Sequence, residues 1–183
     1  MRTLVHLSDL HFGRVDQTLL APLTDLIRCL APDLLVVSGD LTQRARSQEF
    51  VAARAFLDTL LMPRVVVPGN HDIPLHNVFD RFLRPLQKYR RHMTDDLQPF
   101  FVDDEIAVAG INTARSLTIK DGRINQQQMA QVAARFAGLP NSLVKIIVTH
   151  HPFDLPDHFN ASYWWDVLIL RCEVLLAAVP TCF

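Results

Sequence analysis

Cysteine is scarce in this sequence, and the few cysteines follow no disulfide or metal-binding spacing. The chain of 183 residues contains three, Cys29, Cys172 and Cys182. An odd, unpatterned set argues against a disulfide framework and fits a reducing compartment. The N-terminal residues also lack a long apolar run followed by a cleavage site. We therefore expect no signal peptide and a cytoplasmic location.

An excess of charge and long hydrophobic runs are absent as well. The formal net charge is −1, so the charge balance does not favour nucleic acid or an anionic membrane surface as a partner. The nearest candidate for a membrane span, residues 167–179, is interrupted by Arg171 and Glu173. It is also shorter than the ~18 apolar residues that a span needs. We expect no membrane partner, and nucleic-acid binding is a minor alternative.

The composition that remains is that of a globular protein, with 49% hydrophobic and 20% charged residues. A chain of this length can bury one sizeable core. We find no internal repeat, low-complexity segment or linker, so we predict a single domain over residues 1–183.

Hydrophobic periodicity predicts an α/β fold that begins with a βαβαβ unit. Apolar runs alternate with amphipathic segments, an order that gives parallel strands with right-handed crossovers. A hairpin or a pair of adjacent strands, turned at Asp103–Glu105, follows, and then one more helix and one more strand. The predicted strands are residues 4–7, 34–37, 65–67, 100–102, 106–111 and 144–148, and the predicted helices are residues 19–30, 47–61, 78–89 and 126–136.

Polar clusters follow four of the predicted strands directly. Because they lie on loops at one edge of a sheet, their Asp, Asn and His side chains can converge. These residue types bind borderline divalent metals, and the absence of cysteine from the set argues against a structural zinc site. The clusters are Asp9-Leu10-His11, Gly39-Asp40, Gly69-Asn70-His71-Asp72 and Thr149-His150-His151-Pro152.

Together with Gly110-Ile111-Asn112-Thr113, these motifs resemble those of the calcineurin-like metallophosphoesterases. The resemblance extends from Met1 to about Tyr163. Within that family the chain is most similar to the bacterial 3',5'-cyclic-nucleotide phosphodiesterases, which act on substrates such as cyclic AMP. The resemblance implies a β-sandwich flanked by helices. It also implies hydrolysis of small phosphoesters, such as phosphodiesters, by a hydroxide that bridges two divalent ions. The ligands accept manganese, iron, zinc or cobalt.

The resemblance assigns a role to each polar residue. Asp9 and His11 would bind the first metal, because side chains two residues apart on an extended segment lie on the same side and can form an Asp-x-His chelate. Asn70 and His150 would bind the second metal, and Asp40 would bridge the two. Four residues of the set would act near the substrate. His71 would act as a general acid or as a hydrogen-bond donor to the leaving oxygen and the phosphate, and Asp72 would orient His71 or raise its pKa. Asn70 would also bind a phosphate oxygen, and His151 would contact the substrate or support a metal ligand.

One departure from the family pattern opens an alternative. The family ends its metal site with a Gly-His-x-His word, which this sequence does not contain. We interpret the chain as C-terminally truncated, without the terminal strands, or altered by a reading-frame error after Tyr163. The alternative function is then a catalytically impaired or inactive remnant. Its open sheet edge would favour homo-oligomers.

Arg44 and Arg46 leave a second question open. They follow the Gly39-Asp40 loop, where they are either solvated surface charges or groups that face an anionic substrate.

Overall fold

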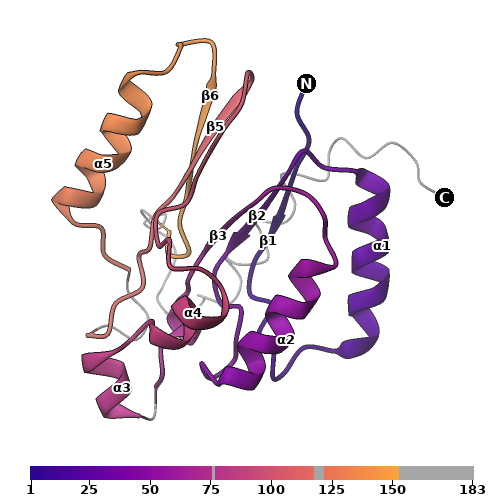
Figure 1. Ribbon diagram of the computed structural model, residues 1–183, viewed down its shortest axis with the longest axis vertical. Coiled ribbons are helices and arrows are strands. Elements are labelled where there is room, and N and C mark those ends of the chain that lie inside the picture. Colours follow the sequence, from indigo (N-terminus) through magenta and orange to yellow (C-terminus); the bar gives the residue numbers. More distant parts are fainter. Residues whose placement is uncertain (76, 118–121, 153–183) are drawn as a thin grey trace, which may run out of the picture.

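The computed structural model describes residues 1–75, 77–117 and 122–152. Within them, two three-stranded sheets pack face to face, with helices on both outer sides (Figure 1). This arrangement confirms the expected α/β sandwich. The predictions made for the tail, including the missing terminal strands, lie outside the described residues. Among the described residues, no helix is long and apolar enough to cross a membrane.

The first sheet contains β1 (Leu4–Leu7), β2 (Leu34–Ser38) and β3 (Arg64–Val67), all parallel, with β2 in the centre. Helices α1 (Leu20–Leu30) and α2 (Ser47–Asp58) connect these strands and lie on one side of the sheet (Figure 1). This is the predicted βαβαβ unit. Every residue of β2 is buried, as its continuous apolar run requires.

The second sheet is mixed. Strands β4 (Phe100–Val102) and β5 (Ile106–Gly110) form the predicted antiparallel hairpin. Strand β6 (Val144–Val148) pairs with β5 in parallel. Helix α5 (Gln126–Ala137) makes that parallel connection possible and covers the outer face of this sheet through Val132.

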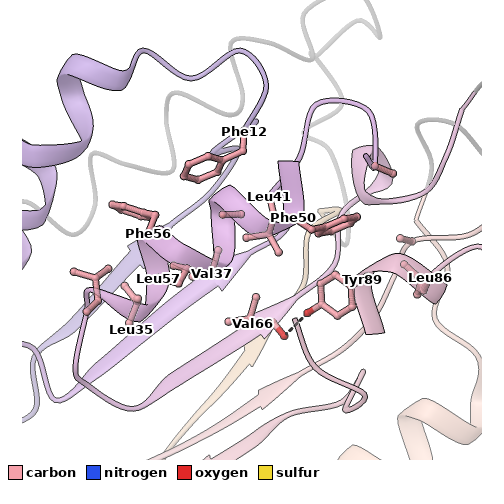
Figure 2. Packing of buried hydrophobic residues seen from close by; sticks show 14 of the residues in the cluster. Phe12, Leu35, Val37, Leu41, Phe50, Phe56, Leu57, Val66, Leu86 and Tyr89 are labelled. Atoms are coloured by element: carbon pink, nitrogen blue, oxygen red, sulfur yellow. Dashed lines mark hydrogen bonds between the residues drawn. The ribbon is translucent and has the colours of Figure 1, made fainter. Parts of the chain in front are cut away.

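Alternation along the central strand divides the core into two layers. Leu34 and Val36 of β2 face the second sheet, where they pack with Val108 of β5. Leu35 and Val37 point the other way, toward the helices. Figure 2 shows this helix-facing layer, in which Phe50, Phe56 and Leu57 of α2 pack above the sheet. The two faces of one strand therefore hold both halves of the fold together.

The predicted helix over residues 78–89 is wrong in its continuity. The structure has α3 (Val78–Leu83) and α4 (Gln87–His92) with a break between them. Pro85 explains the break, because it donates no backbone hydrogen bond and keeps Arg84 out of the helical conformation. Helix α4 is anchored by fully buried Tyr89, whose hydroxyl donates to the Val66 carbonyl of β3 at 3.1 Å (Figure 2).

Two leucines near the end of α2 test how much the helix-facing core contributes to stability. Leu57 is fully buried, whereas Leu61, just beyond the helix, is 94% exposed. We expect Leu57→Ala to lower the free energy of unfolding by about 2–5 kcal/mol, because it leaves a cavity between helix and sheet. Leu61→Ala should change it by less than about 0.5 kcal/mol. Urea unfolding followed by circular dichroism measures both, and equal losses would contradict this packing.

Candidate metal centre

The loops that follow β1 and β2 run side by side and bring three predicted ligands together. Backbone hydrogen bonds join the two loops, from Asp9 N to Gly39 O at 3.2 Å and from His11 N to Asp40 O at 2.9 Å. The loops turn sharply rather than running extended. Asp9, His11 and Asp40 all have positive φ, at 57°, 44° and 52°. The expected extended Asp-x-His chelate is therefore wrong in its backbone, although both side chains still reach one place.

Asp40 lies at the centre of the site and is 3% exposed. Its two carboxylate oxygens face different histidines: Oδ2 lies 3.8 Å from His11 Nε2, and Oδ1 lies 3.4 Å from His150 Nε2. Oδ1 also accepts a hydrogen bond from the backbone N–H of His71 at 2.9 Å. A carboxylate with one oxygen on each side has the geometry of a bridge between two ions.

Spacing between donor atoms gives a test of whether these residues fit metal ions. Two groups have ligand atoms within 4.8 Å of one another: Asp9, Asp40 and His150, and His11, Asp40 and His71. His11 Nε2 lies 3.6 Å from Asp9 Oδ1, too far for a hydrogen bond. Ligand atoms that share one ion at about 2.0–2.2 Å are separated by roughly 3–4 Å. The residues present therefore fit two neighbouring cations that share Asp40.

Histidine 150 joins the second sheet to the first at this point. Its Nδ1 lies 2.8 Å from the Ser38 carbonyl, which accepts a hydrogen bond from Nδ1–H and leaves Nε2 of the neutral ring free to bind a metal. Nε2 lies 2.9 Å from Asn70 Oδ1. The structure thus brings Asn70, His150 and Asp40 together, as the sequence predicted for the second metal.

Neighbouring groups shift the pKa values of Asp9 and His11, the pair predicted to bind the first metal. Burial alone would raise the pKa of Asp9, but His11 and the Ser8 hydroxyl, which donates to the carboxylate, lower it overall. Burial would likewise lower the pKa of His11, but the carboxylates of Asp9 and Asp40 raise it. Ionised carboxylates beside an imidazole are a charge environment that also suits a cation.

His71 is oriented by a residue to which the sequence gave no role. Its Nδ1 lies 2.9 Å from the Gln43 carbonyl, so Nδ1 carries the proton in the neutral ring and Nε2 is left for the site. Its ring meets that of His11 edge to face, with centroids 4.8 Å apart. Gln43 belongs to the Gly-Asp-Leu-Thr-Gln motif, so it was visible in the sequence. Its role was not, because sequence spacing does not show which backbone carbonyl points toward a histidine ring.

Asp72 has a different task from the one expected. Its fully buried carboxylate accepts hydrogen bonds from Gly69 N at 2.9 Å, and from Thr42 N at 2.9 Å and Thr42 Oγ1 at 3.0 Å. No hydrogen bond joins it to the His71 ring within the described part of the chain. Asp72 ties the two loops together, and the prediction that it orients His71 is wrong. Burial, with Asp40 nearby, raises the pKa of Asp72 to about 6.

His151 lies behind the ligands rather than among them. It is 8% exposed, and its Nδ1 lies 2.7 Å from the Thr113 hydroxyl of the Asn112-Thr113 word. Burial, with His150 and Arg115 nearby, lowers the pKa of His151 to about 4, so the ring is neutral at pH 7. Its ring contacts that of His150, with centroids 4.8 Å apart. The structure therefore places it beside a ligand, and its contact with substrate stays a prediction.

Comparison with known proteins agrees with this geometry. The model of the family described as "Calcineurin-like phosphoesterase" matches residues 2–176. The chain belongs to the calcineurin-like phosphoesterase family. This membership implies divalent metal ions, which the clustered Asp, Asn and His side chains are suited to hold. It also confirms the resemblance that the sequence motifs indicated.

Individual relatives match over part of their length. Glycerophosphodiester phosphodiesterase GpdQ of Enterobacter lignolyticus (strain SCF1) is 32% identical over 124 residues, which cover 57% of this chain and 44% of that protein. The chain thus matches less than half of this relative. Phosphopantetheinyl hydrolase (PptH) from Mycobacterium tuberculosis is a similar solved structure, with 19% identity, a TM-score of 0.37, and 96% of this chain and 64% of that chain covered.

Removing one charge from the shared ligand tests the metal centre directly. We expect Asp40→Asn to reduce Mn²⁺ binding at both positions at least tenfold, because one anionic bridge is lost. Asp25→Asn, at an exposed position on α1, is the matched control and should bind as the unaltered protein does. Calorimetric titration with MnCl₂ and the metal-dependent rise in Tm both report binding. Unchanged binding in Asp40→Asn would remove Asp40 from the site.

Glycine 69 tests how closely the third loop must approach Asp40. A Cβ at Gly69 would lie 2.1 Å from Asp40 Oδ1 and 2.4 Å from Asp40 N, so it would displace the carboxylate. Gly69→Ala should therefore weaken Mn²⁺ binding and lower Tm. Gly138→Ala is the control, because a Cβ there meets nothing within 4 Å. Equal Tm and Mn²⁺ affinity in the two variants would show that the loops adjust without cost.

Proposed function

We propose that this chain is a phosphoric ester hydrolase whose substrates are small phosphodiesters. Family membership and the phosphodiesterase relative support this proposal. The single observation that carries it is the position of the Asp40 carboxylate, in which one oxygen faces His11 and the other faces His150. A carboxylate placed in this way could be shared by two neighbouring cations, and two cations favour the hydrolysis of an anionic ester.

Two divalent ions, when bound, would neutralise the phosphate oxygens and lower the pKa of a bound water. Manganese, iron, zinc and cobalt all suit the Asp, Asn and His donors. Asp9 and His11 would hold one ion, Asn70 and His150 the other, and Asp40 both. Backbone hydrogen bonds brace the loops that carry Asp9, His11, Asp40 and Asn70, and the His150 ring is held at the Ser38 carbonyl, so little reorganisation would accompany the reaction.

His71 would handle the proton of the leaving group. The Gln43 carbonyl fixes the proton on Nδ1, so the imidazolium form would direct its second proton from Nε2 into the site. A leaving alkoxide oxygen within reach could take that proton. A neutral ring would instead hold its free Nε2 toward water. The role therefore depends on the protonated state of His71.

The substrate within this class is a further part of the proposal. The motifs resemble those of cyclic-nucleotide phosphodiesterases, and the GpdQ relative is named for glycerophosphodiesters. Both substrates are phosphodiesters, so both belong in a first screen with Mn²⁺. Bis-p-nitrophenyl phosphate gives the general assay. Absence of Mn²⁺-dependent hydrolysis above the Asp40→Asn background, from folded protein, would favour the impaired-remnant alternative.

The leaving group separates a general acid from a residue that only binds phosphate. Phenolate is a poorer leaving group than p-nitrophenolate and needs more help from an acid. We expect His71→Gln to lower kcat for a phenyl phosphodiester about 10²-fold or more, and to lower it less for the p-nitrophenyl diester. His92→Gln, on α4 and stacked on Phe50, should leave the ratio of the two rates unchanged. Equal losses on both esters would assign His71 to binding alone.

A further inference from the structure

The loop after β6 carries a metal ligand but is held differently from the other ligand loops. Backbone hydrogen bonds join the loops after β1 and β2 to each other. Within the described part of the chain, no backbone-to-backbone hydrogen bond joins residues 149–152 to the loops of the first sheet. His150 is held there by its ring, whose Nδ1 donates to the Ser38 carbonyl at 2.8 Å. Side chains must therefore fix the direction of this ring.

The ring of His151 packs against the ring of His150. The two ring centroids lie 4.8 Å apart, and the two planes meet at 83°. The hydrogen bond from His150 to Ser38 selects the nitrogen that faces the cation, but it leaves the ring able to tilt about that bond. A neighbouring ring at nearly a right angle restricts this tilt. A Cβ at Gly122 would lie 2.5 Å from His151 Cγ, so His151 itself has little room to shift.

Thr113 holds His151 through one hydroxyl group. Its Oγ1 lies 2.7 Å from His151 Nδ1, and it accepts the backbone N–H of His151 at 3.4 Å. A hydroxyl can donate one hydrogen bond while it accepts another, so a single oxygen contacts both the ring and the main chain of His151. Thr113 is 3% exposed. Removal of its hydroxyl would therefore leave the His151 Nδ1 buried without this partner.

Thr113 is in turn held by helix α5. The buried side chain of Gln128 donates from Nε2 to the Asn112 carbonyl at 2.8 Å, and its Oε1 accepts from Arg115 Nη2 at 2.6 Å. Arg115 also donates to the Ala114 carbonyl at 3.1 Å. The residues on both sides of Thr113 are thus anchored to the helix that covers the second sheet. A continuous set of contacts leads from α5 to a metal ligand.

We propose that Thr113 is a positioning residue, which acts through His151 to hold the His150 ring in the direction that binds the second cation. The inference rests on the proposed function, because it assumes the two-cation site that this function uses. A ligand that is already oriented loses little conformational freedom when the ion binds, so its support raises the affinity. Loss of a residue that orients a metal ligand weakens metal binding by about 10- to 100-fold.

Removal of the Thr113 hydroxyl tests the inference. Thr113→Val keeps the size of the side chain but loses both contacts with His151, whereas Thr113→Ser keeps the hydroxyl. In calorimetric titrations with MnCl₂, we expect one of two binding steps to weaken about 10-fold in Thr113→Val and to stay within about 2-fold in Thr113→Ser. Thr24→Val is the control, because the Thr24 hydroxyl donates to the Leu20 carbonyl within α1. It should bind Mn²⁺ as the unaltered protein does.

Two readouts separate positioning of the ligand from a general loss of stability. A role in stability alone would lower the Tm of metal-free Thr113→Val and leave its Mn²⁺ affinity unchanged, which would overturn the inference. The visible absorption of bound Co²⁺ depends on the number and geometry of its ligands. We therefore expect Thr113→Val to change the Co²⁺ spectrum and Thr113→Ser to preserve it.

The inference and the proposed function can fail separately, because neither readout needs turnover. Weaker Mn²⁺ binding and an altered Co²⁺ spectrum in Thr113→Val, but not in Thr113→Ser, would support the inference even if no phosphodiester is hydrolysed. Mn²⁺-dependent hydrolysis with unchanged binding and spectrum in Thr113→Val would overturn it and leave the proposed function intact. Binding of fewer than two Mn²⁺ ions by the unaltered protein would overturn it as well, since no second cation would be positioned.

Discussion

The carboxylate of Asp40 is the point on which the site depends, because three loops from two sheets meet there. The loop after β1 reaches it through the His11 ring, whose Nε2 lies 3.8 Å from Oδ2, and the loop after β3 reaches it through the His71 N–H, which donates to Oδ1. The loop after β6 reaches it through the His150 ring. Gly69 lies against it so closely that any side chain would move it. The ends of four strands, three from the first sheet and one from the second, meet at one end of the sandwich, and Asp40 joins their loops into one site.

That convergence concentrates negative charge in a buried place. Asp72 ties the loops together, yet burial and Asp40 raise its pKa to about 6. A carboxyl whose pKa is higher in the folded protein than in the unfolded chain favours folding in acid. In the absence of metal its contribution is therefore lost as pH rises through about 6. Cations beside Asp40 would oppose this repulsion, so metal binding and the stability of the loops are coupled through the same charge.

Much of the fold followed from the sequence, since its strands are short apolar runs and its first helices are strongly periodic. The clustering of the Asp, Asn and His side chains followed as well, because each of these polar motifs comes directly after a strand. The break between α3 and α4 was missed despite Pro85, since the apolar spacing continues across it. The roles of Asp72 and Gln43 were not predictable: adjacency in sequence suggested that Asp72 serves His71, but the turn sends the two side chains in different directions.

The backbone of the ligand loops argues that side-chain chemistry was selected over local stability. Asp9, His11 and Asp40 all occupy the left-handed region, where glycine is the residue of least strain. Ala31 and Ala45 also have positive φ and carry no ligand atom, so the conformation alone does not identify a site. The combination does: three strained residues in two adjoining loops all carry metal-binding side chains, and those side chains point to one place. Their strain is maintained because glycine, which would relieve it, has no atom to offer a cation.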